Sequence, residues 1–206
     1  MKVTNVLKKK NKVIVSFDHD EDLIFPYDLF LEHTLIEDDT VSQKEREIFS
    51  DKIQFYLIKQ SSFRYLSGRN HSKYELKLKL LKKKFNKELI AVVLSDLERL
   101  NYLDDKIFAN FYFNTRLKKK KGLGLIKAEL SKKGVSRQII DDIAFEFLDD
   151  PIQEESSLYL SEKKLKVLRR KNFSNIQLKQ KIFQFLSYKG FSTDIIKTTI
   201  DKLKIE

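Results

Sequence analysis

The chain contains no cysteine among its 206 residues, which excludes disulfide bonds, zinc ribbons and thiol catalysis. Long apolar runs are also missing. The opening residues, MKVTNVLKKKNK, lack the apolar core of a signal peptide, and the patch from Leu89 to Leu94 is too short to cross a bilayer. We therefore expect a cytoplasmic protein in a reducing compartment, with no membrane contact.

Charge is what the sequence has in excess. Charged residues make up 34% of the chain and give a formal net charge of +11, whereas an average protein is about one quarter charged. The first 60 residues are slightly acidic, so the surplus of lysine and arginine lies in the rest of the chain. This surplus favours attraction to polyanions and does not by itself define a fold.

Residues 1–60 have the pattern of a small β-containing region. The β-branched run Val13–Phe17 and the apolar run Leu23–Tyr27 flank the turn-prone segment Asp18–Asp22, which predicts a β-hairpin with Pro26 at a strand end. A short helix is expected over 28–33. Ser42 and Glu45 form a capping-box pattern that opens a longer helix running towards Ser67.

From residue 61 onward the chain is expected to be helical and to repeat itself. Three segments, KKKFNKELIAVVLSDL, SKKGVSRQIIDDIAFEF and SYKGFSTDIIKTTIDKL, align at their apolar, turn and cap positions. Self-similarity at this spacing is typical of repeat architectures, in which each unit is stabilised by stacking on its neighbours. The aligned columns are Leu80, Leu130 and Leu186; Phe85, Val135 and Phe191; Asn86, Ser136 and Ser192; and Ile90, Ile140 and Ile196.

Each repeat is predicted to contain a tight corner between two helices. Gly134 and Gly190 suit the left-handed position that follows a helix, and Asn or Ser then caps the next helix. Lys84 stands at the equivalent position of the first repeat, where a left-handed conformation would cost up to about 1 kcal/mol. Asp104 is expected to cap a third helix of the first repeat, and Asp149-Asp150-Pro151 to play the same part in the second.

These patterns predict a mainly α fold. Tandem three-helix repeats would form an elongated, curved array over residues 61–121, 122–171 and 172–206, the last repeat being truncated, after the hairpin-bearing region 1–60.

Several catalytic chemistries fit the sequence poorly. Gly122-Leu123-Gly124 follows a lysine-rich helix rather than a buried strand, so we interpret it as a helix junction and not as a phosphate loop. The three histidines share no metal-ligand spacing, and the paired aspartates at 104–105 and 149–150 sit where helices begin. The predicted helix after Ser136 is too acidic to enter a DNA groove. We expect no enzyme, no cofactor, no metal and no small-molecule substrate.

Three basic runs are the candidate binding residues. The densest lies at the end of a predicted helix, and the other two fall at or near repeat corners, where they could meet nucleic acid or an acidic filament surface. Attraction of cations to a helix C-terminus is the structural alternative, worth about 0.3–1 kcal/mol each. No stacking platform of aromatic residues interleaves with these runs, which argues against dedicated single-strand binding. The residues are Arg116, Lys118, Lys119, Lys120 and Lys121; Lys82, Lys83 and Lys84; and Arg169, Arg170 and Lys171.

Four motifs, taken in order, resemble the RecX family of regulatory proteins, which modulate the RecA recombinase. The resemblance implies three tandem three-helix repeats without enzymatic activity that bind along the RecA–DNA filament and inhibit ATP hydrolysis and strand exchange. It leaves open whether contacts to RecA or to single- or double-stranded DNA dominate. The motifs are Arg69-x-x-Ser72-x-x-Glu75-Leu76, Leu103-Asp104-Asp105-x-x-Phe108-Ala109, Lys133-Gly134-Val135-Ser136 and Lys189-Gly190-Phe191-Ser192.

Three hypotheses follow for the function. The first is a regulator of the recombinase filament in recombination and DNA repair. The second is a general nucleic-acid-binding helical protein, and the third is an adaptor for some other acidic protein.

Overall fold

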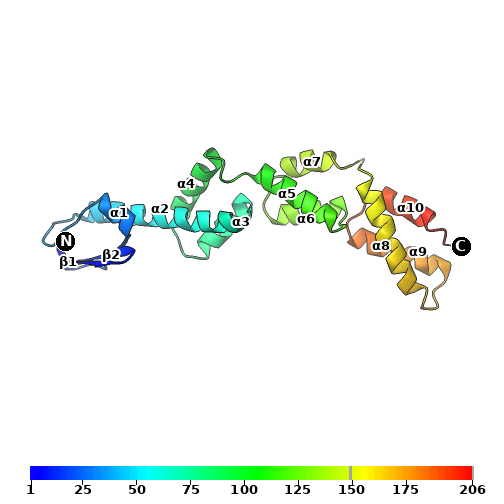
Figure 1. Ribbon diagram of the computed structural model, residues 1–206, viewed down its shortest axis with the longest axis horizontal. Helices are drawn as coiled ribbons and strands as arrows, with labels where there is room; N and C mark the ends of the chain where they lie inside the picture. Colours follow the sequence, from blue (N-terminus) through cyan, green and yellow to red (C-terminus); the bar gives the residue numbers. More distant parts are fainter. Residues whose placement is uncertain (149, 206) are drawn as a thin grey trace. The chain divides into compact units, whose positions relative to one another are not determined.

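A computed structural model describes residues 1–148 and 150–205 (Figure 1). The described chain forms two compact units. Unit 1 contains Met1–Asn70 and Leu76–Leu103, and unit 2 contains His71–Glu75 and the chain from Asp104 onward. Asp149, part of the predicted Asp149-Asp150-Pro151 motif, lies outside the described residues. The predicted mainly helical fold of tandem three-helix repeats after a small β region is confirmed.

The N-terminal region is a three-stranded antiparallel sheet. Its strands β1 (Val3–Lys9), β2 (Lys12–Phe17) and β3 (Leu23–Pro26) are neighbours in chain order. The predicted hairpin is β2–β3, in which Val13 pairs with Phe25 and Val15 with Leu23. Strand β1 was not predicted. One face of the sheet is buried with Phe30 of α1 (Tyr27–Leu31) and Ile53 of α2 (Gln43–Gly68).

Three helical groups follow, each with its own apolar core. The second half of α2 packs with α3 (Lys73–Leu81) and α4 (Lys87–Arg99). A second core joins α5 (Asp105–Lys118), α6 (Leu123–Lys132) and α7 (Arg137–Phe145). A third joins α8 (Ile152–Leu168), α9 (Asn175–Tyr188) and α10 (Thr193–Lys202). The helix that begins after Asp104 therefore packs with the two helices that follow it, whereas the sequence analysis placed it at the end of the first repeat.

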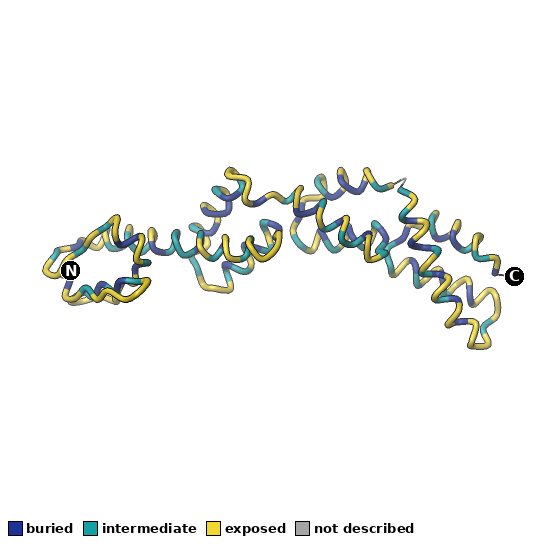
Figure 2. The backbone as a smooth tube through the Cα atoms, in the orientation of Figure 1, coloured by how far each residue is buried: buried dark blue, intermediate teal, exposed yellow. Residues whose placement is uncertain are grey.

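The aligned apolar columns form the centres of these cores. Leu80, Leu130 and Leu186 are each 0% exposed. Figure 2 shows buried positions recurring along each helix between exposed ones, as expected for amphipathic helices. The predicted caps are present too. The side chains of Asn86, Ser136 and Ser192 accept hydrogen bonds from backbone N–H groups of the next helix, and the capping boxes of α2 and α9 are both formed.

The repeat corners have the predicted left-handed backbone. Lys84, Gly134 and Gly190 have φ angles of 61°, 75° and 87°. Lysine therefore adopts a conformation that usually favours glycine. Its corner is held by side chains of α2: Lys83 Nζ donates to Ser61 Oγ at 3.0 Å, and Asn86 N donates to Gln54 Oε1 at 3.1 Å.

The two glycine corners are contacted by residues at the start of another helix. Gly122 N, at the N-cap of α6, donates to Lys189 O at 2.9 Å, and Gly124 N donates to Gly190 O at 2.9 Å. Ser72, which the repeat alignment equates with Gly122, donates from its hydroxyl to Lys133 O at 2.6 Å. At both corners the acceptor is thus the carbonyl of the residue before the glycine. The Ser72 side chain binds it at one corner, and the Gly122 backbone binds it at the other.

These contacts leave no room for a side chain at the corner. A Cβ atom on Gly134 would lie 2.4 Å from Tyr74 Cβ, and one on Gly190 would lie 2.2 Å from Leu125 N. The predicted interpretation of Gly122 as a helix junction is confirmed. The reason for a glycine there is steric, because a Cβ on Gly122 would lie 2.2 Å from the carbonyl carbon of Gly190.

We predict that Gly134→Ala lowers the free energy of unfolding by about 2 kcal/mol or more. The left-handed conformation costs a non-glycine residue about 1 kcal/mol, and overpacking adds about 1–3 kcal/mol. Urea unfolding followed by circular dichroism measures the change. The matched control, Lys84→Gly, should leave stability unchanged or raise it by up to about 1 kcal/mol. Equal unfolding midpoints for Gly134→Ala and the wild-type protein would contradict the close approach of Tyr74.

Candidate functional site

The densest basic run occupies the end of α5 and the turn that leads into α6. We call Arg116 and Lys118–Lys121 the basic cluster. Two of its members converge on one carboxylate of α6: Arg116 Nε lies 3.2 Å from Glu129 Oε2, and Lys121 forms an ion pair with the other oxygen, Oε1. Arg116 also donates from Nη2 to the hydroxyl of Tyr112 at 2.8 Å. These two cations are therefore held within the fold.

The electrostatics of Glu129 follow from this arrangement. Burial by itself raises the pKa of Glu129, but hydrogen bonds from Lys121 and Tyr112 and the charge of Arg116 outweigh burial and leave the pKa below its usual value. Burial likewise raises the pKa of the Tyr112 hydroxyl, which donates to Glu129 Oε2 at 2.9 Å. At neutral pH, Glu129 is therefore a carboxylate that holds the α5–α6 turn to α6.

The remaining members of the basic cluster differ from these two. Lys120 has a φ of 56° and places its ammonium 4.4 Å from the centre of the Tyr159 ring of α8. Lys118 and Lys119 are exposed at the C-terminal end of α5, and neither side chain takes part in an ion pair within the described residues. The basic cluster therefore divides into two cations paired with Glu129, one lysine beside Tyr159, and two exposed lysines.

The other two basic runs also lie after helices. Lys82, Lys83 and Lys84 form the turn after α3 in unit 1, all with exposed side chains, and Lys83 Nζ lies 5.4 Å from the Tyr65 ring centre. Arg169 is the C-cap of α8, and Arg170 and Lys171 follow it in unit 2.

Lys171 lies beside aromatic side chains, contrary to the sequence analysis. It lines a groove with Phe173, Phe185 and Tyr188. The expectation that no aromatic platform accompanies the basic runs is wrong for this run, and single aromatic rings also lie beside Lys83 and Lys120 in the other two runs. Phe173 follows Lys171 closely in the sequence, whereas Phe185 and Tyr188 belong to α9 and are brought near Lys171 by folding.

The paired aspartates have structural roles. Asp104 Oδ1 caps α5 by accepting from the backbone N–H groups of Lys106 and Ile107, as predicted. The neighbouring Asp105 accepts from Lys73 N at 2.8 Å, and Asp141 lies 2.8 Å from Lys127 Nζ. No group of three or more potential metal ligands occurs within residues 1–148 and 150–205.

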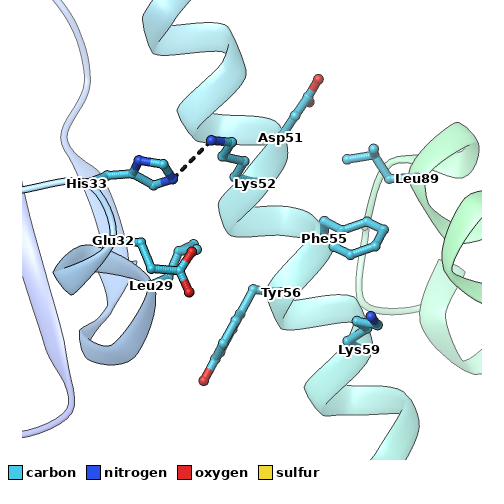
Figure 3. Close-up of a pocket in the computed structure, with 9 residues that line it drawn as sticks. All are labelled: Leu29, Glu32, His33, Asp51, Lys52, Phe55, Tyr56, Lys59 and Leu89. Carbon is cyan, nitrogen blue, oxygen red and sulfur yellow. Dashed lines mark hydrogen bonds between the residues drawn. The ribbon is translucent and has the colours of Figure 1, made fainter.

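A cavity of about 560 Å³ lies in unit 1 between α1, α2 and α4. Figure 3 shows Phe55, Lys52 and Lys59 projecting from α2 into this region, with His33 facing Lys52. Both of its lysines have partners: Lys52 Nζ lies 3.0 Å from His33 Nε2, and Lys59 Nζ lies 3.8 Å from Asp96. The cavity could not be predicted from the sequence, because its lining residues are far apart in the chain.

No helix in the described part of the chain combines the length and the apolar character that a bilayer crossing demands. The architecture and the basic surface define the class: a protein of tandem three-helix domains that displays cationic turns.

Comparisons with known proteins define the family. Family models for the first, second and third three-helix domains of RecX match residues 59–97, 104–142 and 153–200. A "Regulatory protein RecX" from Streptococcus sanguinis (strain SK36) is 30% identical over 207 residues, which covers 100% of this chain and 78% of the relative. One from Clostridium botulinum (strain Eklund 17B / Type B) is 27% identical and covers 97% of this chain and 94% of the relative. The chain belongs to the RecX family.

Solved structures agree with this assignment. The crystal structure of RecX from Lactobacillus salivarius superimposes with a TM-score of 0.66 at 29% identity, over 74% of this chain and 98% of that one. Another structure, described as a regulatory protein RecX, gives a TM-score of 0.74 at 22% identity over 97% of this chain and 98% of its own. The structure with a TM-score of 0.74 shows that the fold is shared across nearly the whole chain, including the N-terminal sheet region.

We predict that Glu129→Gln destabilises the protein by about 1–2 kcal/mol at pH 7, because Arg116 and Lys121 lose their shared charged acceptor. The lowered pKa of Glu129 gives the pH dependence. Its contribution is full above the pKa of an unfolded glutamate and disappears as the pH falls through the lower pKa of the folded state. Thermal or urea unfolding of both proteins between pH 7 and pH 3 should therefore show the difference shrinking with acid. Glu162→Gln, at an exposed position of α8, is the control and should change little.

Proposed function

We propose that this chain is a non-enzymatic regulator that binds the RecA–DNA filament and inhibits its ATPase and strand-exchange activities in recombination and DNA repair. Membership of a family of regulatory proteins supports the regulatory role. The name shared by the relatives points to RecA as the partner. The acidic surface or the DNA of the filament would be recognised by the cationic turns.

The observation that carries the proposal is the division of the basic cluster. Glu129 binds Arg116 and Lys121, which fixes the turn, and Lys118 and Lys119 project beside it without ion-pair partners in the described chain. Cations on a fixed turn lose less conformational entropy on binding than cations on a mobile tail. Two exposed, adjacent lysines would attract phosphates or carboxylates with a strength that falls as salt increases.

A general nucleic-acid-binding function is the alternative, since the net charge of +11 favours any polyanion. The two functions are separated by DNA-dependent ATP hydrolysis of the cognate recombinase at physiological salt. Inhibition at amounts well below the DNA phosphates supports the filament regulator. Tight binding to bare DNA with unchanged hydrolysis supports the alternative.

We predict that Lys118→Ala/Lys119→Ala raises the concentration needed for half-maximal inhibition by about threefold to tenfold, since rim charges contribute modest electrostatic attraction. The salt dependence of inhibition should weaken as well, while thermal stability changes by less than about 0.5 kcal/mol. Lys8→Ala/Lys9→Ala is a matched control, because it removes the same charge from two adjacent exposed lysines of β1. Equal inhibition curves for the two double variants would contradict a specific role for the basic cluster.

A further inference from the structure

A groove on the third three-helix group is lined by residues of α8, of α9 and of the loop that joins them. Its volume is about 460 Å³, within the range of about 300–1,000 Å³ that is typical of small-ligand sites. Lys164 and Leu168 come from α8, Lys171 and Phe173 from the loop, and Lys181, Gln184, Phe185 and Tyr188 from α9. No carboxylate is among these lining residues, so the groove is cationic.

Two lysines of this groove, and Lys189 next to it in the chain after Tyr188, interact with aromatic rings instead of acids. Lys181 Nζ lies 4.4 Å from the Phe173 ring centre, and Lys164 and Lys189 lie 5.4 and 5.6 Å from that of Phe185. Lys164, Lys181 and Lys189 are half-buried, and no ion pair joins them to a carboxylate in the described chain.

This charge arrangement contrasts with that of the preceding helical group. There, the half-buried Arg116, Lys121 and Lys133 each pair with a glutamate. Half-buried cations without an acidic partner attract an anion from outside, because partial desolvation strengthens their interaction with it.

Tyr188 supplies an unoccupied stacking face beside these cations. Its side chain is 79% exposed at the last residue of α9, and it has no ring contact or hydrogen bond within the described residues. An exposed aromatic ring next to lysines is the combination with which proteins bind single strands: cations track the phosphates while a base stacks on the ring. In a duplex the bases are stacked on one another, so they cannot use such a face.

We propose that the α8–α9 groove binds single-stranded nucleic acid, with phosphates at Lys171 and Lys181 and one base stacked on Tyr188. This inference rests on the groove alone and does not depend on a recombinase partner. It places a second contact surface on the chain, distinct from the basic cluster at the end of α5.

The test measures binding of the full chain to a fluorescently labelled oligo-dT by anisotropy over a range of salt concentrations. Lys171→Ala/Lys181→Ala should weaken binding and reduce the slope of log K against log salt by about 1.4, at about 0.7 for each phosphate that the variant no longer neutralises. The matched control is Lys166→Ala/Lys179→Ala. It removes the same charge from exposed positions of α8 and α9 that do not line the groove, and its slope should stay close to that of the wild-type protein. Equal slopes for the two variants would overturn the proposal.

Tyr188 tests the stacking interaction without risk to the core, because the side chain is exposed. Tyr188→Ala should weaken oligo-dT binding about fivefold or more, and Tyr188→Phe should retain it. A duplex of the same length should bind more weakly than the single strand and be insensitive to Tyr188→Ala.

Competing ligands give further outcomes. Displacement of oligo-dT by poly-glutamate at equal charge concentration, with no effect of Tyr188→Ala, would mean that the groove serves an acidic peptide, and the proposal would fall. Equally tight binding of ATP alone would assign the groove to a free nucleotide and overturn the proposal for a strand. None of these results depends on inhibition of the recombinase, so failure here is distinguishable from failure of the proposed filament regulation.

Discussion

The close approach of one helix start to the corner of another helix pair is the constraint on which the joining of the helical groups depends. A left-handed residue ends one helix, its neighbouring carbonyl is exposed by the turn, and the first residues of another helix bind that carbonyl. A hydrogen bond of this kind contributes about 1 kcal/mol. It also holds the helix start so close to the corner that it restricts which residue type can occupy the corner. Glycine is required because atoms of Tyr74 or Leu125 occupy the space that a side chain would take.

Electrostatic pairing sorts the surplus cations into two groups. Where a glutamate lies within reach, as Glu129 does for Arg116 and Lys121, the cation serves the fold. Where none does, as for Lys118, Lys119 and the lysines of the α8–α9 groove, the charge remains available to an external anion. The 41 lysines and arginines therefore overstate the number of cations open to a partner, since some are paired internally, whereas the net charge of +11 already includes this cancellation.

Much of the local structure could be predicted from residue patterns. Helix caps, left-handed corners and the buried columns at Leu80, Leu130 and Leu186 are set by short-range chemistry that the sequence displays directly. The sequence predicts less well which three helices pack together, because a repeating pattern does not show which helix begins each repeat. Strand β1 was not predicted because it lacks a clear alternation of apolar and polar residues: Val3 is its only buried residue, and its end is rich in lysine. The α8–α9 groove was missed because its aromatic and basic members come from three separate segments.

Lys84 occupies the repeat position at which the other two corners have Gly134 and Gly190. The backbone turn itself tolerates lysine, as its φ of 61° shows, so glycine is needed only where another helix start is seated on the corner. A helix start that approached Lys84 as closely as Gly122 approaches Gly190 would collide with its side chain. The lysine therefore prevents at the first corner the backbone-to-backbone contact made at Gly190, and side chains of α2 hold this corner instead.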